Sequence, residues 1–122
     1  MEDFHDEIMD ETEGPVLCYR ATRAVSDALY SDYIERVKVA IKDYGEFRLL
    51  IYYNNFPGWD EQAAAKDLPF YAEYGRFMKK IALVNAPDKE VMAKFLRKNI
   101  IGGELRVFSE DRLPEALVWI KS

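Results

Sequence analysis

One seven-residue run, Phe47–Tyr53, constrains the fold most strongly, because every position in it except Arg48 is apolar or aromatic. Such a run is typical of a strand that is covered on both faces, as in a parallel sheet flanked by helices. Two shorter and largely apolar runs follow at 80–84 and 105–108, and a helical pattern precedes each of them. Parallel strands need long crossover connections of this kind. The sequence therefore predicts an α/β domain with a mostly parallel sheet.

The N-terminal region predicts an antiparallel hairpin at one edge of this sheet. Residues 1–12 mix acidic and apolar side chains and indicate a short edge strand that frays. A turn is expected at Glu13-Gly14-Pro15, because Gly and Pro favour chain reversal. Residues 16–25 then alternate between more and less polar side chains, as in a hairpin strand with one wetter face.

About four helices complete the predicted architecture. The clearest begins at Ser26 and ends near Tyr44, because its apolar residues recur with a 3.6-residue period and Gly45 follows as a left-handed C-terminal residue. Three more helices are expected at 60–77, 87–98 and 114–120. Pro69 should break the first of these three, since proline lacks the N–H that a helix interior needs.

Together these elements predict a single domain over residues 1–122 with the order β-β-α-β-α-β-α-β-α. The sheet is expected to be mixed and mostly parallel, with four to five strands.

Composition excludes several classes of protein. The net charge of −5 argues against a nucleic-acid binder, whose binding surface should be basic. No run approaches the roughly 18 consecutive apolar residues of a membrane span, and the acidic start does not resemble a leader peptide. A single cysteine, Cys18, excludes an internal disulfide and a cysteine-based metal cluster. We therefore expect a cytoplasmic protein without a transmembrane segment.

One local basic surface is expected on the helix at 87–98. Lys94, Arg97 and Lys98 share a helical face there, with Lys89 one turn earlier. A solvated helix face explains this pattern best. An acidic partner or peripheral contact with an anionic membrane is the alternative.

No residue set in the sequence indicates a known reaction, a cofactor or a metal. His5, the only histidine, lies in the acidic N-terminal segment, so a Ser-His-Asp or Cys-His arrangement has no anchored base. A phosphate-binding glycine motif between a strand and a helix is absent. Acidic residues near helix starts, such as Asp60 and Asp88, are better explained as caps and dipole partners. We expect no catalytic residues.

The expected binding site lies where the strands end, because parallel sheets bind ligands at the loops that leave their carboxyl ends. The most distinctive of these loops is 54–59, with two amides and two aromatic side chains. It could line a pocket, although packing of the loop onto the next helix is the favoured explanation. The candidate residues for binding a ligand or partner are Asn54, Asn55, Phe56, Trp59, Asn85 and Asp88.

Aromatic residues in the predicted helices suggest a second site, an apolar pocket. Most of them are expected to belong to the core or to an interface, and a cavity for an apolar ligand is the less favoured alternative. The candidates are Tyr71, Tyr74, Phe77 and Phe95.

The order of several short motifs resembles that of a known family. These motifs are Gly45-x-x-Arg48-Leu49-Leu50, Phe56-Pro57-Gly58-Trp59, Ala63 to Phe70, Lys80-Ile81-Ala82-Leu83-Val84, Glu104-Leu105-Arg106-Val107-Phe108 and Glu115-Ala116-Leu117-x-Trp119-Ile120. Over nearly the whole chain they resemble a SpoIIAA-like protein of the STAS superfamily, whose fold is shared with CRAL-TRIO lipid-binding domains. The resemblance implies a mixed sheet of four or five strands with helices and no established catalytic residues.

One departure from the STAS pattern bears on regulation. Anti-anti-sigma STAS proteins are switched by phosphorylation of a Ser or Thr beside the start of the helix that follows the central strand. Residues 54–68 contain neither Ser nor Thr, so the resemblance does not extend to this switch.

The sequence thus favours a non-catalytic interaction or regulatory module that binds a protein or a small ligand. Two alternatives stay open: a CRAL-TRIO-like carrier of a small apolar or lipid-like ligand, and an enzyme of a type that leaves no motif. The abundance of Tyr and Phe also predicts a homodimer that pairs through an aromatic helical face, because large exposed apolar surfaces favour association.

Overall fold

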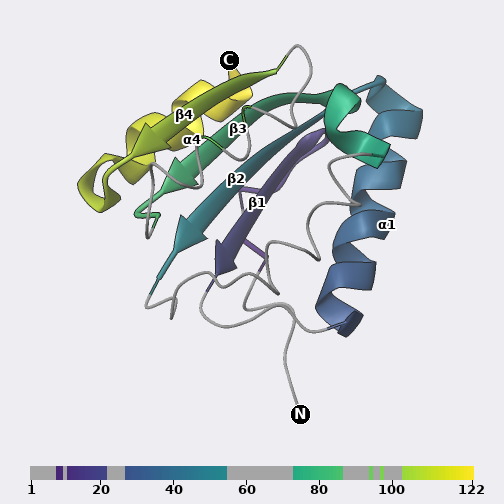
Figure 1. Cartoon of the computed structure of the whole chain (residues 1–122), viewed down its shortest axis with the longest axis horizontal. Helices are drawn as coiled ribbons and strands as arrows, with labels where there is room; N and C mark the ends of the chain where they lie inside the picture. Colours follow the sequence, from purple (N-terminus) through teal and green to yellow (C-terminus); the bar gives the residue numbers. More distant parts are fainter. Residues whose placement is uncertain are drawn as a thin grey trace.

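The computed structural model describes residues 8–9, 11–21, 27–54, 73–86, 94, 97 and 103–122, with the backbone alone at 27–30. These residues form one four-stranded sheet in the order β1-β2-β3-β4, and every neighbouring pair is parallel (Figure 1). The strands are β1 (Val16–Ala21), β2 (Phe47–Tyr53), β3 (Met78–Val84) and β4 (Glu104–Phe108). The two α-helices within the described residues are α1 (Asp27–Tyr44) and α4 (Leu113–Lys121), and two 3-10 turns are η2 (Gly75–Phe77) and η3 (Glu110–Arg112).

The predicted α/β class is confirmed, and so are the strands at the centre of the sheet and the helices α1 and α4. Gly45 follows α1 with φ of 75°, and its N–H donates to the carbonyl of Ile41 at 2.8 Å, as expected for the end of a helix. Of the helix expected at 60–77, the structure describes the end alone, where a helical turn leads into η2. The predicted break at Pro69 lies outside the described residues, as does most of the helix at 87–98.

The predicted N-terminal antiparallel hairpin is not seen among the residues that the structure describes, so the mixed sheet is corrected to a parallel one. β1 ends at Ala21 and pairs in parallel with β2. Among the described residues, antiparallel contact with β1 is limited to two isolated bridges, Ile8 with Tyr19 and Glu13 with Val16. The Cys18 carbonyl accepts from the N–H of Met9 at 2.9 Å and from the Thr12 hydroxyl at 3.0 Å. The N–H of Cys18 donates to that hydroxyl at 2.9 Å, so a side chain supplies part of the contact between β1 and the N-terminal segment.

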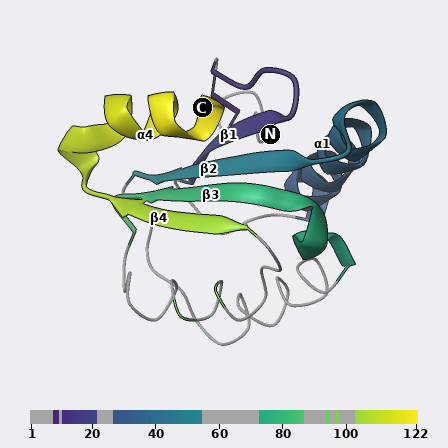
Figure 2. The ribbon, with the colours of Figure 1, turned by 90° about the horizontal axis from the view of Figure 1, so that it is seen from above.

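The two faces of the sheet belong to two separate cores, because side chains alternate along each strand. Figure 2 shows α4 on one side of the sheet. The core on the α1 side is formed by Leu17, Tyr19, Val37, Ala40, Phe47, Leu49, Tyr53, Met78, Ile81 and Leu83. The core on the α4 side is formed by Met9, Val16, Cys18, Leu50, Ala82, Val84, Phe108, Ala116 and Ile120. Both faces of β2 and β3 are therefore buried, as the apolar runs predicted.

Two cations on the sheet hold the last turn of α4. Lys80 is only 9% exposed, and its Nζ donates to the backbone oxygen of Ser122 at 2.9 Å and to its hydroxyl at 2.8 Å. Arg48, which is Lys80's partner in the β2–β3 register, donates from Nη1 to the carbonyl of Ile120 at 3.1 Å and also to the oxygen of Ser122. The last carbonyls of a helix lack partners within the helix and carry partial negative charge. These two side chains therefore stabilise α4 against the sheet.

This attachment can be tested at Lys80, with its neighbour as a matched control. We expect Lys80→Met to lower the free energy of unfolding by about 1–3 kcal/mol, because it leaves carbonyls at the end of α4 without their charged donor. Lys79 is 57% exposed and pairs with Glu46 at 3.7 Å, so Lys79→Met should change the free energy by less than about 0.5 kcal/mol. Denaturant unfolding measures both values, and equal losses would contradict this role of Lys80.

Candidate functional site

The carboxyl edge of the sheet is the candidate functional site. Because the four described strands are parallel, they all end at this edge. The residue that follows β2 and the residue that follows β3 each donate a backbone hydrogen bond to the last residue of a neighbouring strand. The N–H of Asn54 donates to the carbonyl of Ala21 at 3.0 Å. The N–H of Asn85 donates to the carbonyl of Phe108 at 2.9 Å. Two of the predicted site residues, Asn54 and Asn85, therefore follow neighbouring strands at one edge.

Asn85 connects three strands at this edge. Its backbone has φ of 58°, in the left-handed region that Asn tolerates better than most residues. Its side-chain amide donates from Nδ2 to the carbonyl of Tyr53 at the end of β2, at 2.9 Å, while its N–H binds the end of β4. Asn85 therefore supports the site, since its backbone N–H and one donor of its amide are engaged within the fold.

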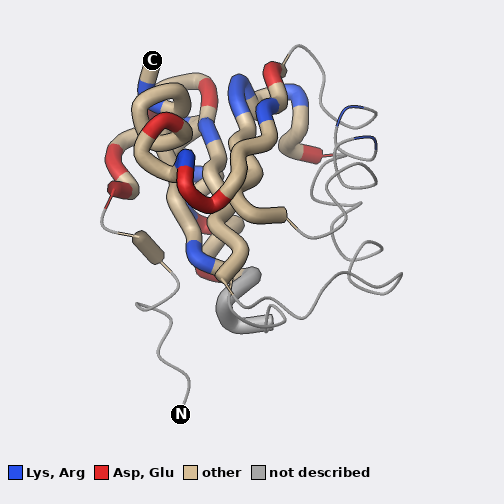
Figure 3. Tube along the Cα trace, turned by 90° about the vertical axis from the view of Figure 1, so that its left-hand side faces the viewer, with Lys and Arg blue, Asp and Glu red and all other residues tan. Residues whose placement is uncertain are grey.

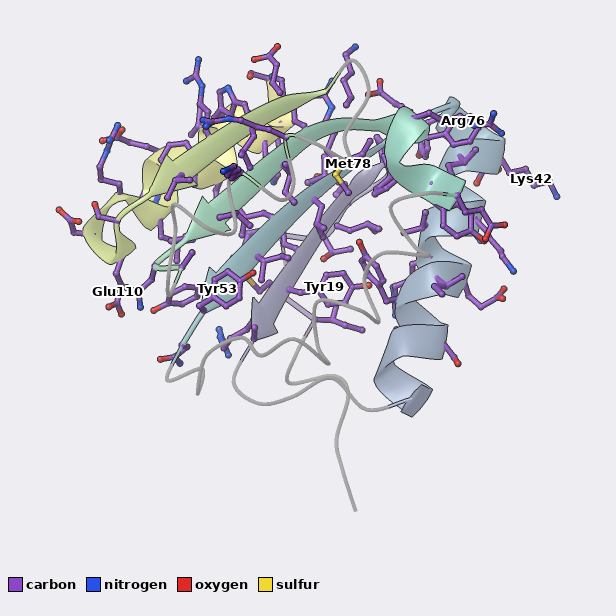
Figure 4. The ribbon with its side chains drawn as sticks, in the orientation of Figure 1. Tyr19, Lys42, Tyr53, Arg76, Met78 and Glu110 are labelled. Atoms are coloured by element: carbon purple, nitrogen blue, oxygen red, sulfur yellow. The ribbon has the colours of Figure 1, made fainter. Side chains whose placement is uncertain are left out.

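A second polar contact joins β2 to the turn after β4. The Tyr52 hydroxyl donates to Oε1 of Glu110 in η3 at 2.8 Å. This hydrogen bond raises the pKa of Tyr52, with smaller contributions from burial and from the charge of Glu110. The positive charge of Arg20, which is opposite Tyr52 in the β1–β2 register, lowers the pKa of Tyr52 and so opposes this shift in part. Figure 4 shows Tyr53 and Glu110 at the arrowhead end of the sheet.

The outer part of this edge carries charges of both signs. Residues 109–112 are exposed, and Arg112 pairs with Glu115 at 2.6 Å. Basic and acidic positions are interspersed on this side of the molecule (Figure 3). A partner that approaches here would meet mixed charges rather than a field of one sign.

The structure tests few of the predicted site residues directly. Asn55, Phe56, Trp59 and Asp88 lie outside the described residues, and so do Tyr71 and Phe95 of the predicted apolar pocket. Tyr74 is partly buried and packs against the core on the α1 side. The apolar pocket therefore stays a prediction.

Phe77 borders a feature that the sequence did not predict, an open depression at the opposite, amino edge of the sheet. This depression has a volume of about 370 Å³. It is lined by Tyr44, Gly45, Glu46, Arg76, Phe77, Met78 and Lys79. The guanidinium of Arg76 lies 4.8 Å from the centre of the Phe77 ring, and Figure 4 shows Arg76 and Met78 near this end of the sheet. The lining is mostly polar, so the depression is not an enclosed apolar cavity.

The residues that sequence reasoning missed are Tyr52, Arg48 and Lys80. For the two cations a signal was present, because a charged residue within a buried apolar strand requires a partner. The contact between Tyr52 and Glu110 depends on strand register, which no local pattern reports.

The single cysteine is a structural core residue. Cys18 is fully buried, and burial raises the pKa of its thiol to about 12, with a further contribution from Glu11. A thiol in this state is a poor nucleophile and a poor metal ligand. Within the part of the chain that the structure describes, no group of three or more His, Cys, Asp or Glu side chains is placed to hold a metal ion. No helix in that part is long and apolar enough to cross a bilayer.

Comparison with known proteins supports the architecture. The model of a protein family described as SpoIIAA-like matches residues 16–121. Searches for similar curated proteins and for similar solved structures found no match. The family match covers every described strand and both α-helices.

The role of Asn85 leads to a test with two variants. Asn85→Gly keeps the left-handed backbone and removes the amide donor, so we expect a loss of about 1 kcal/mol in the free energy of unfolding. Asn85→Ala also strains the backbone and should cost about 1–2 kcal/mol more. Denaturant unfolding compares the two, and an alanine variant as stable as the glycine variant would contradict the role of the positive φ.

Proposed function

The chain belongs to the SpoIIAA-like family, and we propose that it acts as a non-catalytic interaction or regulatory module that binds a protein or small ligand at the carboxyl edge of its sheet. SpoIIAA-like, STAS-type domains are generally non-catalytic. The observation that carries the proposal is the convergence of Asn54, Asn85 and Glu110 at this edge. Open sheets with parallel strands bind their ligands at this end.

Rigidity supports this location. Hydrogen bonds from Asn54 and Asn85 connect the ends of neighbouring strands, and the bond between Tyr52 and Glu110 fixes the start of η3. A surface that is held in place before binding loses little conformational entropy when a partner arrives. The exposed acids Glu110 and Asp111 are then available for polar contacts at the rim.

The proposed site can be tested by reversing its charge. We expect a protein carrying Glu110→Lys and Asp111→Lys to lose a partner that the unmodified chain captures, because both side chains lie on the exposed rim. Glu35→Lys is the matched control, since the Glu35 side chain is 71% exposed on α1. Quantitative affinity capture with mass spectrometry compares the three proteins.

The same experiment has outcomes that contradict the proposal. If the double variant retains the partner while Glu35→Lys loses it, the binding surface lies on α1 and not at the carboxyl edge. If native mass spectrometry instead finds an apolar molecule bound to the purified chain, a ligand carrier becomes the better explanation.

We also propose that this module works without a phosphate switch in the segment after β2. Residues 54–68 contain no Ser or Thr, and Tyr53, the last residue of β2, is only 2% exposed. A kinase needs an accessible hydroxyl, so Tyr53 is a poor substrate in the folded protein.

We therefore expect phosphosite mapping of the protein isolated from cells to find no stoichiometric phosphate between Tyr52 and Leu68. Digestion after unfolding provides the control that peptides from this segment are detected. A stoichiometric phosphate on Tyr53 whose removal changes partner binding would contradict the prediction.

A further inference from the structure

The outer edge of β4 is the feature that the proposed function leaves unused. β4 is the last strand in the sheet order, and Figure 2 shows it along the border of the sheet. No element among the described residues pairs with its outer side. The helix α4 packs over β2 and β3, and α1 packs over β2. An edge strand of this kind presents backbone donors and acceptors that another strand can pair with.

The side chains of β4 follow a pattern that makes the strand complementary to itself. Glu104 and Arg106 are exposed and lie on the α4 side of the sheet. Leu105 and Val107 are partly buried and pack on the α1 side. An acid and a base thus stand two positions apart on the same face, with an apolar residue between them on the other.

We propose that a second copy of this chain pairs with the outer edge of β4 in antiparallel orientation. A two-fold axis perpendicular to the sheet, passing beside Leu105, would generate this pair and keep equivalent faces on the same side. Glu104 then lies opposite the partner's Arg106, and Arg106 lies opposite the partner's Glu104. Leu105 faces the partner's Leu105, and Gly103 faces the partner's Val107.

Charge selects this register over its neighbours. Opposite charges directly across an antiparallel pair stabilise it, and like charges destabilise it. An axis beside Arg106 would oppose the two Arg106 side chains, and an axis beside Glu104 would oppose the two Glu104 side chains. Of these three registers, only the one centred on Leu105 makes two attractive pairs.

The result is a continuous eight-stranded sheet with a small interface. A ladder of about five residues per strand buries less surface than the roughly 1,200–2,000 Å² of a standard protein interface. We therefore expect a reversible dimer with a dissociation constant in roughly the micromolar range or weaker. This interface differs from the aromatic helical face expected from the sequence, so the two models of assembly predict different contacts.

Cysteine cross-linking tests the register. The Cα atoms of directly opposed antiparallel residues lie about 4.5–5.5 Å apart, which suits a disulfide. Under mild oxidation we expect Leu105→Cys to form a covalent dimer. Unmodified protein should form none, since Cys18 is fully buried. Val107→Cys is the matched control, because its proposed partner is Gly103 and not a second cysteine.

Three outcomes of the cross-linking overturn the proposal. They are no covalent dimer from Leu105→Cys, equal yields from Leu105→Cys and Val107→Cys, and linkage only when the two variants are mixed. The last of these would place the axis beside Arg106, since that register puts position 105 opposite position 107.

A charge exchange tests the pairing independently. Glu104→Arg or Arg106→Glu alone puts like charges together twice per dimer and should weaken association by about tenfold or more. The double variant restores opposite charges and should recover the dimer. Arg112→Glu makes the same change on an exposed residue outside β4 and should have no effect. Sedimentation at several concentrations measures association, and circular dichroism confirms folding.

Failure of the double variant to recover association while it remains folded would overturn the proposal. So would an unmodified protein that stays monomeric at concentrations of several hundred micromolar, on the order of the upper limit expected for such a small interface. A dimer whose association is unchanged by Glu104→Arg, by Arg106→Glu and by the double variant would favour a helical face as the interface. None of these outcomes bears on the binding site at the carboxyl edge, whose test uses different residues.

Discussion

The burial of both faces of β2 and β3 is the constraint on which the rest of the structure depends. A parallel strand without a cover would expose a continuous apolar surface, so α1 must lie on one face and α4 on the other. The helix α4 follows β4, the last strand in the described order, and packs back over β2 and β3. Lys80 and Arg48 anchor it through hydrogen bonds to its last turn.

The arrangement divides the sheet into a buried centre and edges with different properties. The carboxyl edge is closed by hydrogen bonds from Asn54 and Asn85, and its outer rim carries exposed acids. The amino edge holds an open polar depression, and no described element pairs with the outer edge of β4. We propose the first edge for a ligand or protein partner and the edge at β4 for a second copy of the same chain.

Local patterns predicted the elements with a clear period or a clear end. The helix before Gly45, the apolar strand at Phe47–Tyr53 and the C-terminal helix all agree with the structure. The predicted N-terminal hairpin is not seen among the described residues, because alternation reports which side chains are buried and not which segment pairs with a strand. In the fold, β1 pairs in parallel with β2 and meets the described N-terminal residues through two isolated bridges and the Thr12 hydroxyl. For the candidate site, sequence reasoning placed Asn54 and Asn85 at the carboxyl edge of the sheet, where the structure has them.

The sequence by itself determined the α/β class and the ends of β2, β3 and β4, because periodicity and turn residues act over a few neighbouring positions. The order of its short motifs resembled that of the family that the family model then matched. The tertiary structure alone decided that the four described strands are all parallel, that Tyr52 meets Glu110 and that Lys80 reaches the end of α4. The hydrogen bond between Tyr52 and Glu110 joins residues 58 positions apart, and the one between Lys80 and Trp119 joins residues 39 positions apart. Contacts at such separations depend on register and on crossover geometry, which arise only when the whole sheet has assembled.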